Sequence, residues 1–282
     1  MESSNKTCSY FEIDISEHNI SFLHGIGIPL VLFSLLSNII ATLGTWKMNI
    51  SCSSRSSKLL IYQFVVYILV TLDVVLLYAY PYLTYRSLTI ITSVHLPSVM
   101  FLTLLGSSNQ VLLSIDRFLL LRRGKSYKNW KDAFTSVIIS VIISCLCIIL
   151  YFWYLLDKRC CDGVRMALIL QGSVVFICLL ISISFNVIML LYLKKNLTRM
   201  RSHRSRLKRK ISQTMITITV ASAICEIIHI IVSGTIALLS RGTFLEKGYF
   251  LLGGLFLVNL LKCGIYPFIY LIRNYNIERN IF

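Results

Sequence analysis

Three ionisable residues lie inside long apolar runs of this sequence: Asp73, Glu226 and Lys262. A charged side chain is costly to hold in lipid, so such residues face the inside of a helix bundle and mark ion pathways, switches or buried ion pairs. Counting about 1.5 Å per residue from the ends of the runs places all three near the middle of the membrane. We expect Lys262 to pair with Glu226, with Asp73, or with both, either as a fixed packing contact or as a switch.

A histidine, His229, lies one helical turn after Glu226 and shares its face. It is either a proton-sensitive partner of the carboxylate or a buried histidine whose hydrogen bonds are satisfied, and the second interpretation is favoured. Ionisable residues at this depth also suit a proton-coupled transporter. The sequence has no internal repeat and no pair of runs broken by Gly or Pro, which many transporters have, so the transporter is an alternative only.

The elements that must position these residues are apolar runs. Hydrophobic residues make up 56% of the 282 residues, and a membrane-spanning helix needs roughly 20 of them in succession. Seven runs qualify: Ile20–Trp46, Leu59–Leu83, Leu88–Leu121, Ala133–Leu156, Met166–Leu193, Ile211–Leu239 and Tyr249–Ile272. They are continuous rather than alternating, which predicts helices and excludes a β-barrel. We therefore expect an all-α bundle of seven transmembrane helices over residues 20–272, after an N-terminal segment, 1–19, and before a tail, 273–282.

The net charge of +16 is distributed unevenly between the two sides of the membrane. The connections on one side, with the tail, carry 20 Lys and Arg residues, and those on the other side, with the N-terminal segment, carry 7. The positive-inside rule places the first side in the cytoplasm and the N-terminus outside. The basic charge then sets the topology and attracts anionic lipid or a cytoplasmic partner, so we expect no binding of nucleic acid.

Two kinds of covalent modification are predicted on the outer side. Asn5 and Asn19 are in acceptor motifs for glycans, whereas matching motifs at Asn49 and Asn196 fall in cytoplasmic connections and should stay unmodified. Three cysteines face the oxidising side: Cys8, Cys160 and Cys161. A disulfide from Cys8 to either of the other two would fix the N-terminal segment over the second outer loop.

A carboxylate and an arginine stand side by side at the cytoplasmic end of the third run, in Asp116-Arg117-Phe118. A carboxylate at the membrane edge can hold the neighbouring arginine until another group competes for it. This motif resembles the Asp-Arg-Tyr signature of the rhodopsin-like (class A) G-protein-coupled receptors. In that family the arginine faces the G protein.

Other motifs agree with this resemblance, in order and on the correct side of the runs. Ser37-Asn38 matches the family's Gly-Asn, and Asp73 matches its sodium-site carboxylate. Tyr192 matches the tyrosine that meets the arginine in active receptors. The family's Asn-Pro-x-x-Tyr motif is matched by Tyr266-Pro267-Phe268-Ile269-Tyr270. The resemblance covers the whole chain and implies a receptor that signals to heterotrimeric G proteins from the plasma membrane. It assigns coupling and switching to Asp116, Arg117, Tyr192, Pro267 and Tyr270. An intramembrane polar network is expected from Asn38, Asp73, Glu226, His229 and Lys262.

No Ser/His, paired-Asp or His-Glu-x-x-His constellation is present, so we expect no enzyme, no cofactor and no metal.

The departures from the family pattern are as informative. Cys225-Glu226-Ile227-Ile228 stands where the family has Cys-Trp-x-Pro, the fifth run has no proline, and the third run lacks the family's outer cysteine. Lys262 beside the sodium site predicts that its ammonium replaces the ion. A compact, Ile-rich chain that lacks these switch residues resembles receptors encoded by herpesviruses, of the orphan or chemokine-receptor type.

That second resemblance implies a receptor that is active without agonist, in the host cell membrane, with a chemokine ligand or none. A non-signalling decoy that binds host receptors as a heteromer, or pairs with itself, is an alternative. After the last run, Arg273–Phe282 is polar enough for a short amphipathic helix on the membrane surface.

Overall fold

Every residue that the computed structural model describes is helical. The described residues are 17–51, 55–78, 85–123, 160–195, 203–238 and 241–278, with 138, 141–142, 144–146 and 149. They form α1 (Glu17–Ser51), α2 (Arg55–Tyr78), α3 (Tyr85–Arg123), α5 (Cys160–Lys195), α6 (His203–Leu238) and α7 (Arg241–Glu278). The predicted all-α class is therefore confirmed for this part of the chain.

Each of these 6 helices contains a stretch long and apolar enough to cross a membrane. The stretches coincide with six of the seven predicted runs, which makes the chain a multi-pass membrane protein. The remaining predicted run, Ala133–Leu156, falls mostly outside the described residues, so a seventh crossing stays a prediction.

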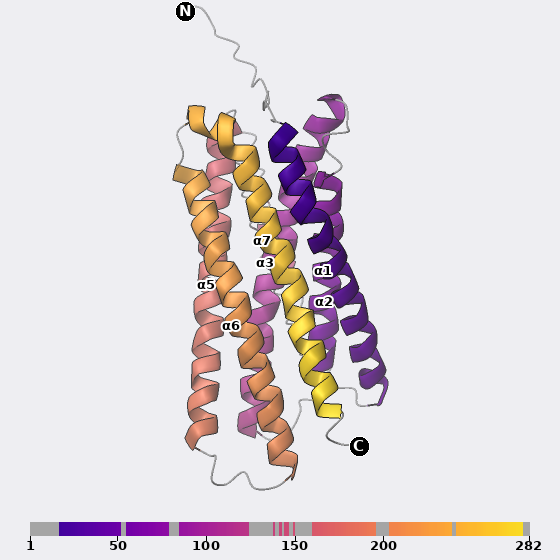
Figure 1. Cartoon of the computed structure of the whole chain (residues 1–282). Helices are drawn as coiled ribbons and strands as arrows, with labels where there is room; N and C mark the ends of the chain where they lie inside the picture. The colour runs from indigo at the N-terminus through magenta and orange to yellow at the C-terminus, as the bar shows by residue number, and fades with distance from the viewer. Residues whose placement is uncertain are drawn as a thin grey trace, which may run out of the picture.

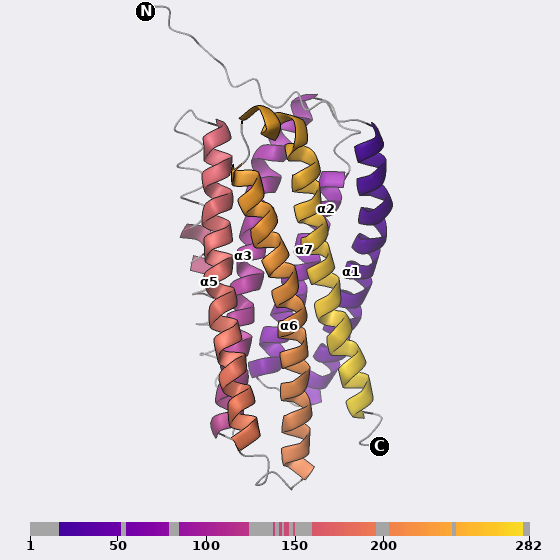
Figure 2. The same cartoon turned by 60° about the vertical axis from the view of Figure 1, so that its left-hand side comes forward.

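The helices stand side by side in one elongated bundle (Figures 1 and 2). Going round it, α1 packs against α2, α2 against α3, α3 against α5, α5 against α6, α6 against α7, and α7 against α1. Further contacts join α2 to α7 and α3 to α6, so α3 touches three of the other described helices. Side chains on α3 can therefore tie most of the bundle together.

Apolar side chains cover the outside of the bundle as well as parts of its core. Leu43 on α1 and Leu191 on α5 are exposed, at 65% and 62%, whereas Phe64 on α2 and Leu260 on α7 are fully buried. In lipid an exposed leucine costs nothing, and polar side chains are the ones that must turn inward. The bundle interior holds many buried Ser, Thr, Asn and Gln side chains accordingly.

Several helices extend beyond the apolar runs. α6 begins at His203, so the basic stretch up to Lys210 forms its first turns, and α5 ends on Lys194 and Lys195. We call the end of the bundle that carries these residues the basic end. The ends of an apolar run mark where the lipid ends. A helix continues beyond that point as long as its backbone groups are hydrogen-bonded, which explains the helical turns outside the apolar runs.

At one place a helix end differs from the predicted one. α7 continues unbroken to Glu278, so residues 273–278 extend that helix instead of forming a separate one on the membrane surface. α2 is described up to Tyr78, so the predicted end of its run at Leu83 stays a prediction. Residues 79–84, which include Pro81, lie outside the described part of the chain.

Candidate functional site

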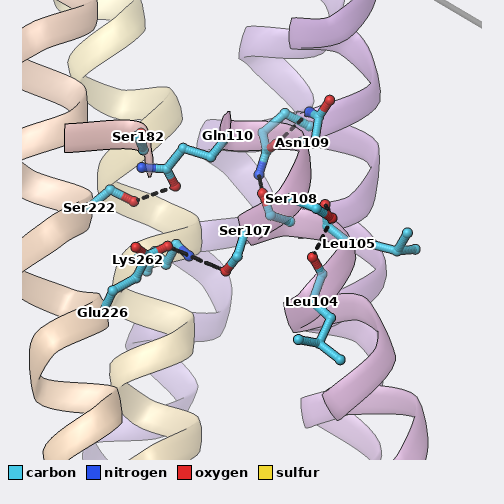
Figure 3. Close-up of polar contacts among 12 residues, drawn as sticks. Leu104, Leu105, Ser107, Ser108, Asn109, Gln110, Ser182, Ser222, Glu226 and Lys262 are labelled. Atoms are coloured by element: carbon cyan, nitrogen blue, oxygen red, sulfur yellow. Dashed lines mark hydrogen bonds and ion pairs between the residues drawn. The ribbon is translucent and has the colours of Figure 1, made fainter. Parts of the chain in front are cut away.

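An ion pair joins α6 to α7 in the middle of the bundle (Figure 3). Lys262 Nζ lies 2.5 Å from Glu226 Oε1, and the two side chains are only 6% and 3% exposed. Ser107 on α3 completes the group, because its hydroxyl accepts a hydrogen bond from Lys262 Nζ and donates one to Glu226 Oε1, both 3.4 Å long. Of the partners that the sequence leaves open for Lys262, the structure shows Glu226.

A layer of buried polar groups lies about one turn from this ion pair, on the side away from the basic end. It consists of Thr103 on α3, His229 and Ser233 on α6, and Asn259 on α7. Among the described residues, Thr103 Oγ1 and Ser233 Oγ have no hydrogen-bond partner, whereas Asn259 lies close enough to His229 to hydrogen-bond with it. Both interpretations of His229, a proton-sensitive partner of Glu226 and a buried histidine with satisfied hydrogen bonds, therefore stay predictions.

Asn38 ties α1 to α7 at the proline of the seventh run. Pro267 has no amide hydrogen, so the carbonyl of Cys263, four residues earlier, loses its donor within the helix. Asn38 Nδ2 donates to that carbonyl at 2.8 Å and also to Ser34 O at 2.7 Å. The predicted polar role of Asn38 is thus a structural one, because its amide replaces the helix hydrogen bond that Pro267 cannot make.

Asp73 does not lie at the depth of Asn38. The hydroxyls of Ser34 and Thr71 meet at 2.8 Å and fix the register of α1 against α2. Asn38 is four residues from Ser34 toward the basic end, and Asp73 is two residues from Thr71 in the opposite direction, which separates them by roughly 9 Å along the bundle. Two members of the expected intramembrane polar network, Asn38 and Asp73, therefore lie at different depths.

Three further hydrogen bonds join α3 to its neighbours next to the ion pair. Gln110 Oε1 accepts from the hydroxyl of Ser222 on α6 at 3.0 Å (Figure 3). On the other face of α3, Asn109 Nδ2 donates to Gln63 Oε1 on α2, and Gln63 Nε2 donates to Gly106 O at 3.2 Å. Each of these amides lies in the core, where an unmade hydrogen bond would cost about 1–3 kcal/mol.

Closer to the basic end, α3 is tied to α5. The hydroxyls of Ser114 and Ser182 are 2.8 Å apart, and Asn186 Nδ2 donates to Ser114 Oγ at 3.2 Å. One turn further on, the rings of Phe118 and Phe185 pack with centroids 5.8 Å apart. Residue numbers increase together along both helices here, so α3 and α5 run in the same direction.

Several polar side chains of α3 and of α6 recur along one face of each helix. We call these faces the α3 stripe (Thr103, Ser107, Gln110, Ser114 and Arg117) and the α6 stripe (Thr219, Ser222, Glu226, His229 and Ser233). Both follow steps of three and four residues, the spacing of one helical face. Sequence reasoning missed the uncharged members, although this spacing was the signal that could have found them.

The remaining coupling residues lie near the basic end. Asp116 is buried, and Arg117 Nε is a buried donor that has no partner among the described residues. Tyr192 packs against a small buried cluster of Met189 and Leu193 on its own helix, which Ile216 of α6 also contacts. These positions agree with an arginine near the end of α3 and a tyrosine near the end of α5.

Tyr270, the last residue of the motif in the seventh run, lies between α1 and α2. Its ring packs against Phe64 with centroids 5.5 Å apart, and its hydroxyl accepts from Thr45 Oγ1 at 3.4 Å. Tyr266, one turn earlier, stacks edge-on to Tyr67 with a centroid distance of 5.6 Å. The motif thus packs α7 against α2 rather than facing α3 directly.

The structure does not test the predicted glycosylation and disulfide sites. Asn5 and Cys8 lie outside the described residues. Asn19 falls in α1, and Cys160 and Cys161 form the start of α5 rather than a loop, without described side chains. The glycans and the disulfide therefore stay predictions.

No protein-family model matches this chain, and no curated protein sequence matches it either. Among the described residues, no group of three or more His, Cys, Asp or Glu side chains is placed to hold a metal ion. What the chain does must be inferred from the contacts of its own residues.

Proposed function

We propose that this chain is a seven-transmembrane receptor that signals to a heterotrimeric G protein. The observation that carries the proposal is the pair Asp116 and Arg117 near the basic end of α3, the helix that touches three others. The guanidinium of Arg117 keeps a buried donor without a partner in the described part of the chain. A donor of this kind is available to a protein that docks at the basic end.

The directions of the helices support seven crossings. α3 and α5 are neighbours that run the same way, so α3 ends at the basic end and α5 begins at the opposite one. The chain between them must return from one end to the other, and it contains the predicted run Ala133–Leu156. Seven crossings place the two termini on opposite sides, and the positive-inside rule puts the basic end in the cytoplasm.

The basic end offers a surface for a cytoplasmic partner. The first turns of α6, from His203 to Lys210, extend the helix past its apolar stretch. Their positive charge can contact the G protein or can simply anchor the topology against anionic lipid. Both roles place this surface on the same side as Arg117.

We further propose that the receptor is active without agonist. Opening the basic end requires α6 to separate from α3, and two of the contacts that resist this are Gln110 with Ser222 and Ser107 with Glu226. Water can replace hydrogen bonds of this kind, whereas an interdigitated apolar interface would have to be separated as a whole. Polar contacts between α3 and α6 thus favour an easily opened bundle.

The test compares Arg117→Ala with a matched control in cells that contain no added ligand. Arg122→Ala removes the same charge from an exposed position on the same helix, five residues further on. At equal surface level we expect G-protein activation by the native chain and by Arg122→Ala, and activation at background in Arg117→Ala. Equal activity in all three would overturn the role of Arg117, and inactivity of all three would favour the non-signalling decoy.

A further inference from the structure

Arg117 on α3 and Tyr266 on α7 bring two buried polar groups close to each other from different helices. The Tyr266 side chain is only 2% exposed, and its hydroxyl has no hydrogen-bond partner among the described residues. Arg117 Nε is a buried donor that also lacks a described partner. The charge of the guanidinium acts on the phenol of Tyr266, so the two groups lie within electrostatic range, although no hydrogen bond joins them.

The register of α3 against α7 accounts for this proximity. The hydrogen bond from Lys262 Nζ to Ser107 Oγ sets the two helices level at the ion pair. Toward the basic end, Tyr266 is four residues beyond Lys262. Arg117 is ten residues beyond Ser107, so its Cα lies roughly 9 Å further along the bundle than that of Tyr266. A long side chain leans toward the N-terminal end of its helix, which for Arg117 is the direction of Tyr266.

The rotation of α3 also turns Arg117 toward the inside of the bundle. Arg117 follows Gln110 by seven residues, or two helical turns, so it shares the face on which Gln110 bonds to Ser222 of α6. From the other side, the ring of Tyr266 packs on Tyr67 of α2. The hydroxyl of Tyr67 lies close enough to Gln63 to hydrogen-bond with it, which leaves the hydroxyl of Tyr266 available to the arginine.

We propose that Tyr266 is a positioning residue for Arg117, whose guanidinium donates a hydrogen bond to the Tyr266 hydroxyl while no G protein is docked. A buried donor and a buried acceptor that both lack a partner lower the free energy by bonding to each other. This contact holds the arginine inside the bundle and ties α3 to α7. The inference rests on the proposed function, because it gives Arg117 a resting place from which the G protein must draw it.

The chemistry of the acceptor sets how firmly the arginine is held. The sequence assigns this holding to Asp116, which is on the same helix and so cannot connect α3 to another one through Arg117. Tyr266 can, but a neutral phenol binds a guanidinium less strongly than a carboxylate does. A docked G protein that offers carboxylates or carbonyl oxygens can therefore compete for Arg117, which agrees with a receptor that is active without agonist.

The first test titrates purified full chain in lipid nanodiscs with the heterotrimeric G protein that the native chain activates in cells. Tyr266→Phe removes only the hydroxyl and frees Arg117. We expect half-maximal activation at a several-fold lower concentration of G protein, with an unchanged maximal rate. Tyr67→Phe is the matched control, since it removes a hydroxyl from the ring that packs on Tyr266, and it should change neither quantity. An unchanged or higher half-maximal concentration in Tyr266→Phe, or an equal shift in both variants, would overturn the proposal.

The second test measures the contact without a G protein, by a double-mutant cycle on thermal unfolding in detergent. Tyr266→Phe should lower the Tm of the native chain and leave the Tm of Arg117→Ala unchanged, because that background has no guanidinium for the phenol to accept from. Additive shifts in Tm would overturn the contact. Non-additive shifts in a chain that activates no G protein would support the contact and reject the proposed function instead.

Discussion

The buried ion pair of Glu226 and Lys262 is stable because each residue neutralises the other. Removing one partner of such a pair leaves an uncompensated charge, which costs about 3–5 kcal/mol, whereas apolar replacement of both is close to neutral. We expect Glu226→Gln to lower the free energy of unfolding by this amount. Thermal unfolding of the purified protein in detergent measures the change.

The control for this prediction replaces both residues by apolar side chains of similar size. Glu226→Leu with Lys262→Met should unfold at a temperature close to that of the native chain. If the double variant is as unstable as Glu226→Gln, the pair stabilises the bundle by more than charge compensation. In that case the hydrogen bonds of both residues to Ser107 are the next contacts to test.

The ion pair was predictable from the sequence only in part. Charged residues stand out in an apolar run, and counting residues gives their depth, so Lys262, Glu226 and Asp73 were found at once. Depth alone does not give the rotation of each helix about its axis, and the choice between Glu226 and Asp73 depends on that rotation. The packing of α6 against α7 settles it.

The uncharged members of the two stripes escaped notice for a different reason. A serine or threonine in a membrane helix commonly bonds to a carbonyl of its own helix, as Ser108 does to Leu104 and Thr71 does to Tyr67. Residue type therefore does not distinguish a hydroxyl in such a local bond from one that faces another helix. Only the periodic spacing together with the structure reveals the stripes.

At the scale of elements, α1 and α7 pack closely together at a glycine of α7. A Cβ atom added to Gly264 would lie 2.5 Å from the ring of Phe33 and 3.5 Å from the Cα of Ser34. Ser37 Oγ also donates to the carbonyl of Gly264 at 3.3 Å, a bond that needs the two helices to stay close. The glycine therefore permits the contact on which the Asn38 bond to α7 depends.

We expect Gly264→Ala to destabilise the protein by about 1–3 kcal/mol, the usual cost of overfilling a packed site. The measurement is thermal unfolding in detergent. Gly254→Ala is the matched control, because it lies on the same helix and its added Cβ meets nothing within 4 Å. Equal effects of the two substitutions would show that helix propensity, and not the contact with Phe33, decides the outcome.

The helices themselves were largely predictable and their ends were not. Apolar runs located the stretches that cross lipid because hydropathy reports the solvent around a helix. It does not report where the backbone stops being helical in water, which explains why α6 begins at His203, well before Ile211. It also explains why α7 continues to Glu278, past the predicted boundary at Ile272.

At the scale of the whole molecule, orientation and helix number are linked. The polypeptide enters and leaves the bundle at opposite ends, since α1 begins at the end away from the basic end and α7 finishes at the basic end (Figure 1). Whichever side holds Arg117 also holds the first turns of α6. The receptor proposal requires this side to be the cytoplasm.

Glycan mapping tests that orientation on the intact chain. Asn5, Asn49 and Asn196 are all in acceptor motifs, and only the first lies on the side predicted to face the secretory lumen. We expect a glycosidase-sensitive shift in gel mobility that Asn5→Gln reduces and that Asn49→Gln and Asn196→Gln leave unchanged. A glycan on Asn196 would place the connection between α5 and α6 outside. Arg117 would then face away from any G protein, and signalling to a heterotrimeric G protein would fail as an explanation.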